Sequence, residues 1–153
     1  MNEILVVEKN PFFSKILVSL VEYYGYKTRS CFYPEYLTEL LDDRPHGIIV
    51  VNLHEDNQEL IHSLNSVADR KINIILLSDY YEKQFEAEPF YQRLYAYLIK
   101  PRGIVYLKEV LEKVVTQGDS VSMAPHLTLD YDARQQELAG DPAPNRSQKI
   151  INY

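Results

Sequence analysis

The feature that most constrains the fold is a series of short apolar runs, rich in β-branched residues, that alternate with helical patterns. The strongest runs are Ile4 to Val7, Ile48 to Val51, Ile72 to Leu77 and Tyr95 to Ile99, and residues 26–30 form a weaker one. Continuous apolar runs of this length are typical of strands that are buried on both faces. Five strands alternating with helices predict a parallel sheet that helices cover on both faces through right-handed crossovers.

The helical segments carry recognisable start and stop signals. Asn10 followed by Pro11 is typical of a helix start, and Gly25 is a common residue just after a helix end. A short helix from about Tyr81 is expected to stop near Pro89, because proline lacks the backbone donor that a helix needs. A final helix is expected to carry one apolar stripe, made of Leu107, Val110, Leu111 and Val114.

Polar residues stand where four of the predicted strands end. They are Glu8 with Lys9, Asn52, Ser78 and Lys100. The carboxyl ends of parallel strands meet at one edge of an open α/β sheet, which is where such folds place their binding and catalytic groups. The sequence therefore predicts one polar site at this edge.

Four motifs resemble the receiver domains of two-component response regulators. They are ILVVEKNP at 4–11, GIIVVNL at 47–53, INIILLS at 72–78 and YLIKP at 97–101, and the resemblance covers roughly residues 3–116. It implies an α/β fold of the flavodoxin-like (CheY-like) class. That fold is a three-layer sandwich with a five-stranded parallel sheet of order 2-1-3-4-5 and helices on both faces.

The resemblance also implies a role for each residue at the carboxyl edge. Family receivers hold Mg²⁺ with an acidic pair, accept a phosphoryl group on an aspartate, and use a hydroxyl, a lysine with a cis proline and a switch aromatic around it. These positions correspond to Glu8 and Lys9, Asn52, Ser78, Lys100 and Pro101, and Tyr97.

Two departures from the family pattern remove the phosphorylation chemistry. An acyl phosphate requires a carboxylate nucleophile, and the amide of Asn52 is a far poorer one. Lys9 and Asn52 also take away negative ligands that Mg²⁺ prefers. We therefore expect an atypical pseudo-receiver with a degenerate phosphorylation site, no bound metal or cofactor, and no enzymatic activity.

Several assignments around this site stay open from sequence alone. Lys9 is either solvent-exposed, paired with Glu8 or placed where the metal would sit, and Lys100 is an alternative partner for Glu8. Asp56 is a candidate substitute phosphoacceptor, although it lies past the strand end. His54 and His62 have no ligand-spaced partners and are assigned no role.

Signalling by protein contacts is the expected function. Family receivers commonly dimerise or dock partners through the face made by the fourth helix, the fifth strand and the fifth helix. In this chain that face is expected to include Tyr91, Tyr95, Leu107 and Leu111. The partner is either another protein or a second copy of the chain.

Composition narrows the other function classes. The chain has 153 residues and a formal net charge of −6, which disfavours nucleic acid as a partner. The single cysteine, Cys31, excludes an internal disulfide and is expected to be a small buried residue. LVVEKNP has no glycine to cradle a phosphate, which argues against a flavin or nucleotide binder. The opening apolar run is too short for a membrane span or a signal-peptide core, so we expect a cytoplasmic protein.

The chain divides by composition into a domain and a tail. We expect a receiver domain over residues 1–117, a linker over 118–126, and at 127–153 either a tail that folds back or the start of a truncated output domain. The L-x-L-D pattern at Leu127 to Asp130 weakly resembles the opening strands of the winged-helix domain of DNA-binding regulators. As it stands, the chain itself is not expected to bind DNA or a membrane.

Overall fold

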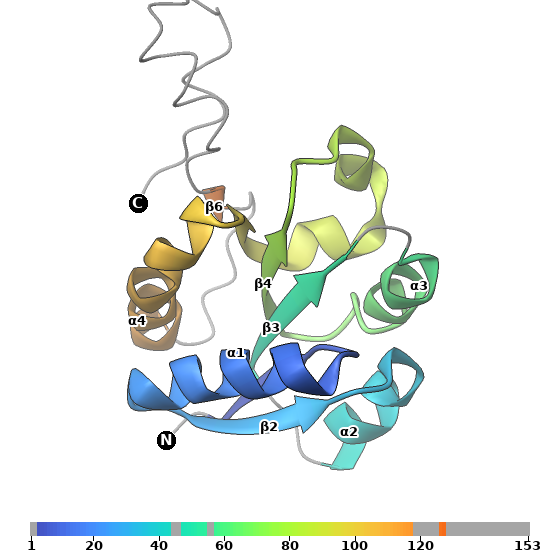
Figure 1. Ribbon diagram of the computed structural model, residues 1–153. Coiled ribbons are helices and arrows are strands. Elements are labelled where there is room, and N and C mark those ends of the chain that lie inside the picture. The colour runs from blue at the N-terminus through green and yellow to red at the C-terminus, as the bar shows by residue number, and fades with distance from the viewer. Residues whose placement is uncertain (1–2, 44–46, 55–56, 118–125, 128–153) are drawn as a thin grey trace, which may run out of the picture.

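The computed structural model describes residues 3–43, 47–54, 57–117 and 126–127 (Figure 1). The strands are β1 (Glu3–Val7), β2 (Lys27–Cys31), β3 (Ile48–Leu53), β4 (Asn73–Ser78), β5 (Leu94–Ile99) and β6 (His126–Leu127). The α-helices are α1 (Pro11–Tyr23), α2 (Leu37–Asp43), α3 (Gln58–Ser66) and α4 (Leu107–Gln117). Short 3₁₀ helices are η1 (Pro34–Tyr36), η2 (Lys83–Ala87), η3 (Pro89–Arg93) and η4 (Arg102–Tyr106).

The sheet is parallel and has the order β2-β1-β3-β4-β5-β6. The expected order 2-1-3-4-5 is confirmed, and β6 adds a strand at the β5 edge by pairing His126 with Ala96 and Leu127 with Tyr97. Residue 126, which we expected at the end of a linker, is therefore part of the sheet. The predicted segments 118–125 and 128–153 lie outside the described residues.

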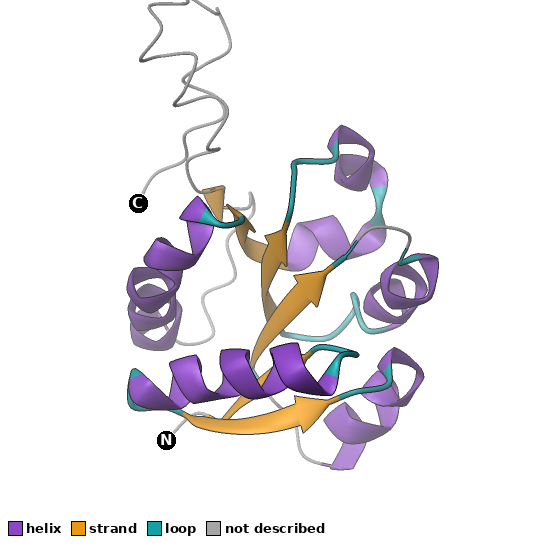
Figure 2. Cartoon of the chain, in the orientation of Figure 1, coloured by secondary structure: helices purple, strands orange, loops and turns teal. Residues whose placement is uncertain are grey.

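Two apolar layers hold the helices on the sheet, because neighbouring residues of a strand point to opposite faces. Leu5 and Ile49 lie on the face that α2 and α3 cover, whereas Ile4 and Val50 lie on the face that α1 and α4 cover (Figure 2). All four of these side chains are completely buried. Each such side chain contributes about 1.5–3 kcal/mol by leaving water, so the central strands fix the architecture.

The start of α1 agrees with the sequence signal. The Asn10 side-chain oxygen accepts hydrogen bonds from the backbone N–H groups of Phe12 at 2.8 Å and Phe13 at 3.2 Å, and Pro11 is the first helical residue. This cap satisfies two of the donors that a helix N-terminus leaves unpaired. After the helix, Gly25 adopts a φ of 102°, a conformation that favours glycine. The chain can therefore turn sharply into β2.

The segment between β4 and β5 differs from the expected α-helix near Tyr81. It consists of η2 and η3, with Pro89 at the start of the second. Asn65 of α3 holds this segment, because its side chain accepts the Phe90 backbone N–H at 3.0 Å and donates to the Glu88 carboxylate at 2.7 Å. These side-chain bonds replace part of the backbone ladder that an α-helix would supply.

Candidate functional site

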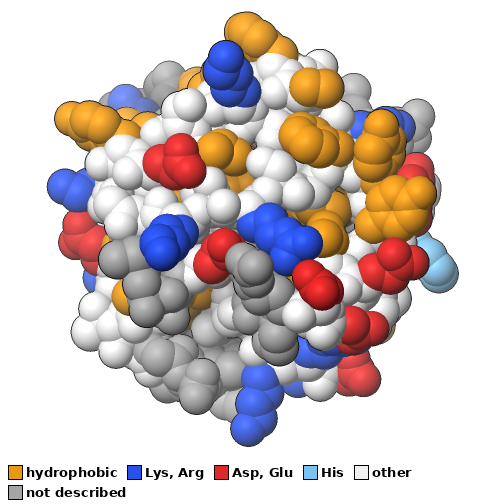
Figure 3. All heavy atoms as spheres, turned by 90° about the horizontal axis from the view of Figure 1, so that it is seen from below, with side chains coloured by type: hydrophobic (Ala, Val, Ile, Leu, Met, Phe, Trp, Pro, Cys, Tyr) orange, Lys and Arg blue, Asp and Glu red, His pale blue; other side chains and the backbone are white. Residues whose placement is uncertain are grey.

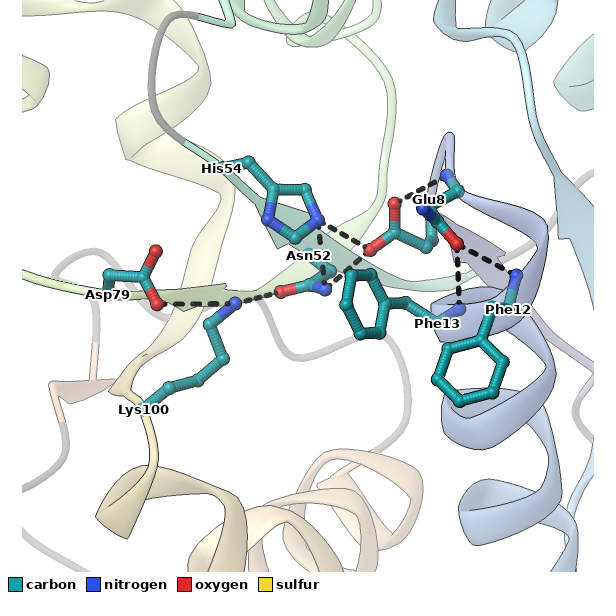
Figure 4. Close-up of polar contacts among 8 residues, drawn as sticks. Glu8, Phe12, Phe13, Asn52, His54, Asp79 and Lys100 are labelled. Carbon is teal, nitrogen blue, oxygen red and sulfur yellow. Dashed lines mark hydrogen bonds and ion pairs between the residues drawn. The ribbon is translucent and has the colours of Figure 1, made fainter.

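The carboxyl edge of the sheet brings Glu8, Asn52 and Lys100 together, as the strand pattern predicts (Figure 4). Glu8 follows β1, Asn52 is the fifth residue of β3, and Lys100 follows β5. Asn52 lies beside Leu77 in the parallel register, so β4 separates Asn52 from β5 and Lys100 reaches across it. The site depends on side chains that meet at this edge from three separate strands.

The carboxylate of Glu8 is completely buried and is surrounded by donors. Its Oε1 accepts from Asn52 Nδ2 at 2.5 Å and from His54 Nε2 at 2.8 Å, and its Oε2 accepts from the Asn10 backbone N–H at 2.8 Å. A buried carboxylate without such donors costs several kcal/mol, so these bonds are what allow Glu8 to be buried. Both carboxylate oxygens are engaged by the protein itself.

The amide of Asn52 links Glu8 to Lys100. Its oxygen accepts from Lys100 Nζ at 2.6 Å while its nitrogen donates to Glu8. Lys100 Nζ also lies 3.6 Å from Asp79 Oδ1, and the Lys100 side chain is only 16% exposed. An amide can serve both neighbours, whereas a carboxylate has no hydrogen to donate to Glu8. We call the set Glu8, Asn52, His54, Asp79 and Lys100 the rim network.

Of the alternatives left open for the two lysines, neither direct pairing with Glu8 is present. Lys100 reaches Glu8 only through Asn52. Lys9 is exposed and lies near Glu35 and Glu59. The pKa of Glu35 is lowered first by a hydrogen bond to its own backbone, then by one from the Glu59 carboxyl group and by the charge of Lys9. The cation that contacts Asn52 is therefore Lys100.

His54 is a member of the site that sequence reasoning missed. Its ring nitrogen bonds to Glu8 although the two residues are 46 positions apart, and its ring centroid lies 5.8 Å from that of Phe13. The signal that would have found it is the strand period of two, which places residue 54 on the same face as residue 52. His62, by contrast, is exposed on α3.

The hydroxyl and the aromatic residue expected at this edge make backbone contacts. Ser78 Oγ donates to the Tyr80 carbonyl at 3.1 Å. The Tyr97 hydroxyl donates to the same carbonyl at 3.0 Å and accepts from the Glu82 backbone N–H at 3.0 Å. Burial raises the pKa of Tyr97 to about 12. Tyr97 is thus a buried strand aromatic that anchors the loop after β4.

The peptide bond between Lys100 and Pro101 is cis, as the resemblance implies. The lone cysteine also agrees with expectation. Cys31 is buried, and burial raises the pKa of its thiol to about 11. Cys31 therefore belongs to the apolar core rather than to a reactive site.

The side chains assigned to an interface are mostly in the core, and that assignment is wrong for three of them. Tyr95, Leu107 and Leu111 are at most 1% exposed. Tyr91 is partly buried, and its hydroxyl lies 3.2 Å from that of Tyr81. The reason is that the apolar stripe of α4 faces the sheet. Large apolar side chains are exposed elsewhere, notably at Phe12, Phe13, Ile16, Tyr23, Tyr33, Tyr36 and Val105.

The donor set of the rim network does not fit Mg²⁺. Both Glu8 oxygens already accept hydrogen bonds, and the Asn52 oxygen accepts from an ammonium group, which would repel a metal cation. Within the described ranges, no three His, Cys, Asp or Glu residues are arranged to hold a metal ion. The predicted substitute acceptor, Asp56, lies outside the described residues.

Comparison with known proteins identifies the fold. The response regulator TrrA of Thermotoga maritima, solved with Mg²⁺ and BeF, is similar with a TM-score of 0.61 and 18% identity, over 74% of this chain and 98% of that one. A receiver domain protein from Clostridium thermocellum is similar with a TM-score of 0.64 and 12% identity, over 76% of this chain and 96% of that one. The N-terminal domain of a response regulator receiver protein from Methanoculleus marisnigri is similar with a TM-score of 0.57 and 22% identity, over 77% of this chain and 99% of that one.

The chain therefore has the CheY-like fold of response-regulator receiver domains. No protein-family model and no curated protein sequence matches it. In the part of the chain that the structure describes, no helix combines the length and the apolar character needed to cross a bilayer.

Proposed function

We propose that this protein is an atypical receiver that transmits a signal through protein contacts, without phosphorylation at position 52, without Mg²⁺ and without enzymatic activity. The CheY-like fold supports the receiver part of this proposal. The contacts of the rim network support the parts that concern phosphorylation at position 52 and Mg²⁺.

The single observation that carries the proposal is the position of the Asn52 amide between Glu8 and Lys100. An aspartate at this position would place a second negative charge beside buried Glu8, and such a pair needs a cation. The asparagine instead donates a hydrogen bond to Glu8. The protein's own groups therefore stabilise the buried Glu8 carboxylate, which a metal ion would otherwise do. The amide also lacks the nucleophilic carboxylate that phosphoryl transfer requires.

The proposed output is association with a protein partner or with a second copy of the chain. Exposed apolar side chains at the start of α1, among them Phe12 at 67% and Ile16 at 52% exposed, support a contact surface. The net charge of −6 weighs against nucleic acid as the partner. Family receivers commonly dock partners through the face made by the fourth helix, the fifth strand and the fifth helix. In this chain η2 and η3 stand where the fourth helix is expected, and β6 pairs with β5 at the edge of the sheet.

The decisive experiment combines intact mass and amide NMR spectra of the protein with Mg²⁺ and either acetyl phosphate or beryllofluoride. We expect no adduct and no shifts of the amides of Glu8, Asn52 and Ser78. The Asn52→Asp variant is the matched control, because it restores the carboxylate alone. A phosphoryl adduct on the unmodified protein, mapped by peptide mass to Asp56 or another acid, would contradict the proposal.

A further inference from the structure

A cavity lies between α1 and η4, directly beside the rim network. Its volume is about 390 Å³, and its apolar wall is formed by Phe13, Ile16, Leu17, Leu20, Leu77 and Ile104. This volume lies within the range of natural small-ligand pockets, which are mostly apolar with a few converging polar groups. We call it the α1–η4 cavity.

Close packing of η4 on the sheet forms one side of the apolar wall. Gly103 lets η4 pack closely on β5, since a Cβ atom at this position would lie 2.8 Å from the Leu98 carbonyl carbon. This close packing positions the adjoining Ile104. On the opposite wall, Phe13 is 45% exposed and Ile16 is 52% exposed. Covering these side chains with an apolar group would remove that surface from water.

The face seen in Figure 3, from below the view of Figure 1, carries groups of hydrophobic side chains with Lys, Arg, Asp and Glu side chains between them.

The other end of the cavity is polar and contains one cation. Asn52, His54, Asp79 and Lys100 line it, and the buried Glu8 does not. The Lys100 ammonium can donate three hydrogen bonds, of which Asn52 takes one at 2.6 Å. Asp79 stays 3.6 Å away, beyond a good hydrogen bond, and its side chain is 55% exposed. An anion that comes within hydrogen-bond distance of Lys100 can replace Asp79 there while Asp79 turns to solvent.

We propose that the α1–η4 cavity binds a small amphipathic carboxylate. Its carboxylate accepts hydrogen bonds from the Lys100 ammonium, and its apolar body lies against Phe13, Ile16 and Ile104. This inference rests on the proposed function, because a phosphoryl group on the acceptor position would compete for Lys100. Such a ligand would cover part of the exposed apolar surface of α1 without any covalent step.

The test compares three probes that share one apolar tail. Octanoate, octanol and octylammonium are titrated into isotope-labelled protein, and the amides of α1 and η4 are followed by NMR. We expect saturable shifts with octanoate and binding at least about tenfold weaker for the other two, because a charge-assisted hydrogen bond contributes this much. Equal binding of octanol, or no saturable shift with octanoate, overturns the proposal.

Two variants separate the polar and apolar parts of the site. Lys100→Met keeps the aliphatic stem and should reduce octanoate affinity about tenfold while leaving octanol binding unchanged. Ile16→Asn changes a half-exposed residue of the wall and should weaken all three probes, whereas Tyr23→Asn, at the exposed far end of α1, should not. Octanoate affinity that is unchanged in either Lys100→Met or Ile16→Asn contradicts the proposal.

The same samples distinguish this inference from the proposed function. Failure of octanoate to bind, together with no response to Mg²⁺ and beryllofluoride, overturns the carboxylate site and leaves the pseudo-receiver proposal standing. A response to beryllofluoride at Asn52 overturns the proposed function itself.

Discussion

The amide of Asn52 has a function that no isosteric residue can reproduce. It presents an oxygen to the Lys100 ammonium and a nitrogen to the Glu8 carboxylate, at 2.6 Å and 2.5 Å. Asn52→Asp keeps the shape but turns the bond to Glu8 into repulsion between two carboxylates. We expect it to lower the free energy of unfolding by about 2–3 kcal/mol.

Urea unfolding measures this loss, and Mg²⁺ should restore part of it in the variant while leaving the unmodified protein unchanged. A variant as stable as the parent without Mg²⁺ would show that the Glu8 carboxylate does not depend on the amide donor.

His54 offers an independent test of the buried carboxylate. His54→Phe removes one donor from Glu8, and the stability should fall by about 1–2 kcal/mol. The control is His62→Phe, an exposed position on α3, where the change should be within about 0.5 kcal/mol. Both values come from urea unfolding at the same pH. Equal effects at the two positions would mean that the bond to Glu8 contributes nothing to folding.

Tyr97 predicts how stability depends on alkaline pH. Burial raises its pKa from 10.0 to about 12 in the folded protein, so the neutral phenol is favoured by folding. The contribution is complete below pH 10, where the unfolded chain is also protonated, and it is lost as the pH rises from 10 through about 12.

The comparison that isolates this contribution is between the parent and Tyr97→Phe. At neutral pH the variant should be about 1–2 kcal/mol less stable, because the Glu82 N–H loses its acceptor. Across the alkaline range this difference should shrink and then change sign, by up to about 2.7 kcal/mol in total, since each pKa unit corresponds to about 1.36 kcal/mol. A difference that stays constant with pH would contradict the assignment.

At the scale of elements, the segment between β4 and β5 shows why a helix was expected and did not form. Apolar and aromatic residues around Tyr81 suit a helix, but Pro89 interrupts the ladder, and Asn65 supplies side-chain bonds to Glu88 and Phe90 instead. Sequence patterns do not reveal such a contact because it joins residues that are more than 20 positions apart. The segment therefore depends on α3 for its shape.

Asn65→Ala should release this segment. We expect a stability loss of about 1–2 kcal/mol and faster hydrogen exchange at the Phe90 amide and its neighbours. Asn57→Ala is the matched control, because Asn57 precedes α3 without a side-chain capping bond. Unchanged exchange at Phe90 in Asn65→Ala would show that the segment holds its shape by apolar packing alone.

At the scale of the whole molecule, the sheet order was implied by the resemblance to receiver domains. The strand runs and their polar ends predicted a parallel sheet and the meeting of Glu8, Asn52 and Lys100. These follow from periodicity and parallel topology, which local sequence encodes well. The role of Tyr95 and Leu107 was misassigned, since composition does not distinguish an aromatic or leucine in the core from one at an interface. The addition of β6 was left open, because pairing of a two-residue strand depends on a tertiary edge.

The direction of β6 has a consequence for how the protein can be labelled or joined to other proteins. Because β6 is parallel to β5, the chain at Leu127 runs toward the edge of the sheet that holds Lys100. Glu3, at the start of β1, lies at the opposite edge. A reporter placed before β1 therefore starts on the far side of the sheet from the rim network, whereas a group inserted directly after Leu127 starts on the same side as it.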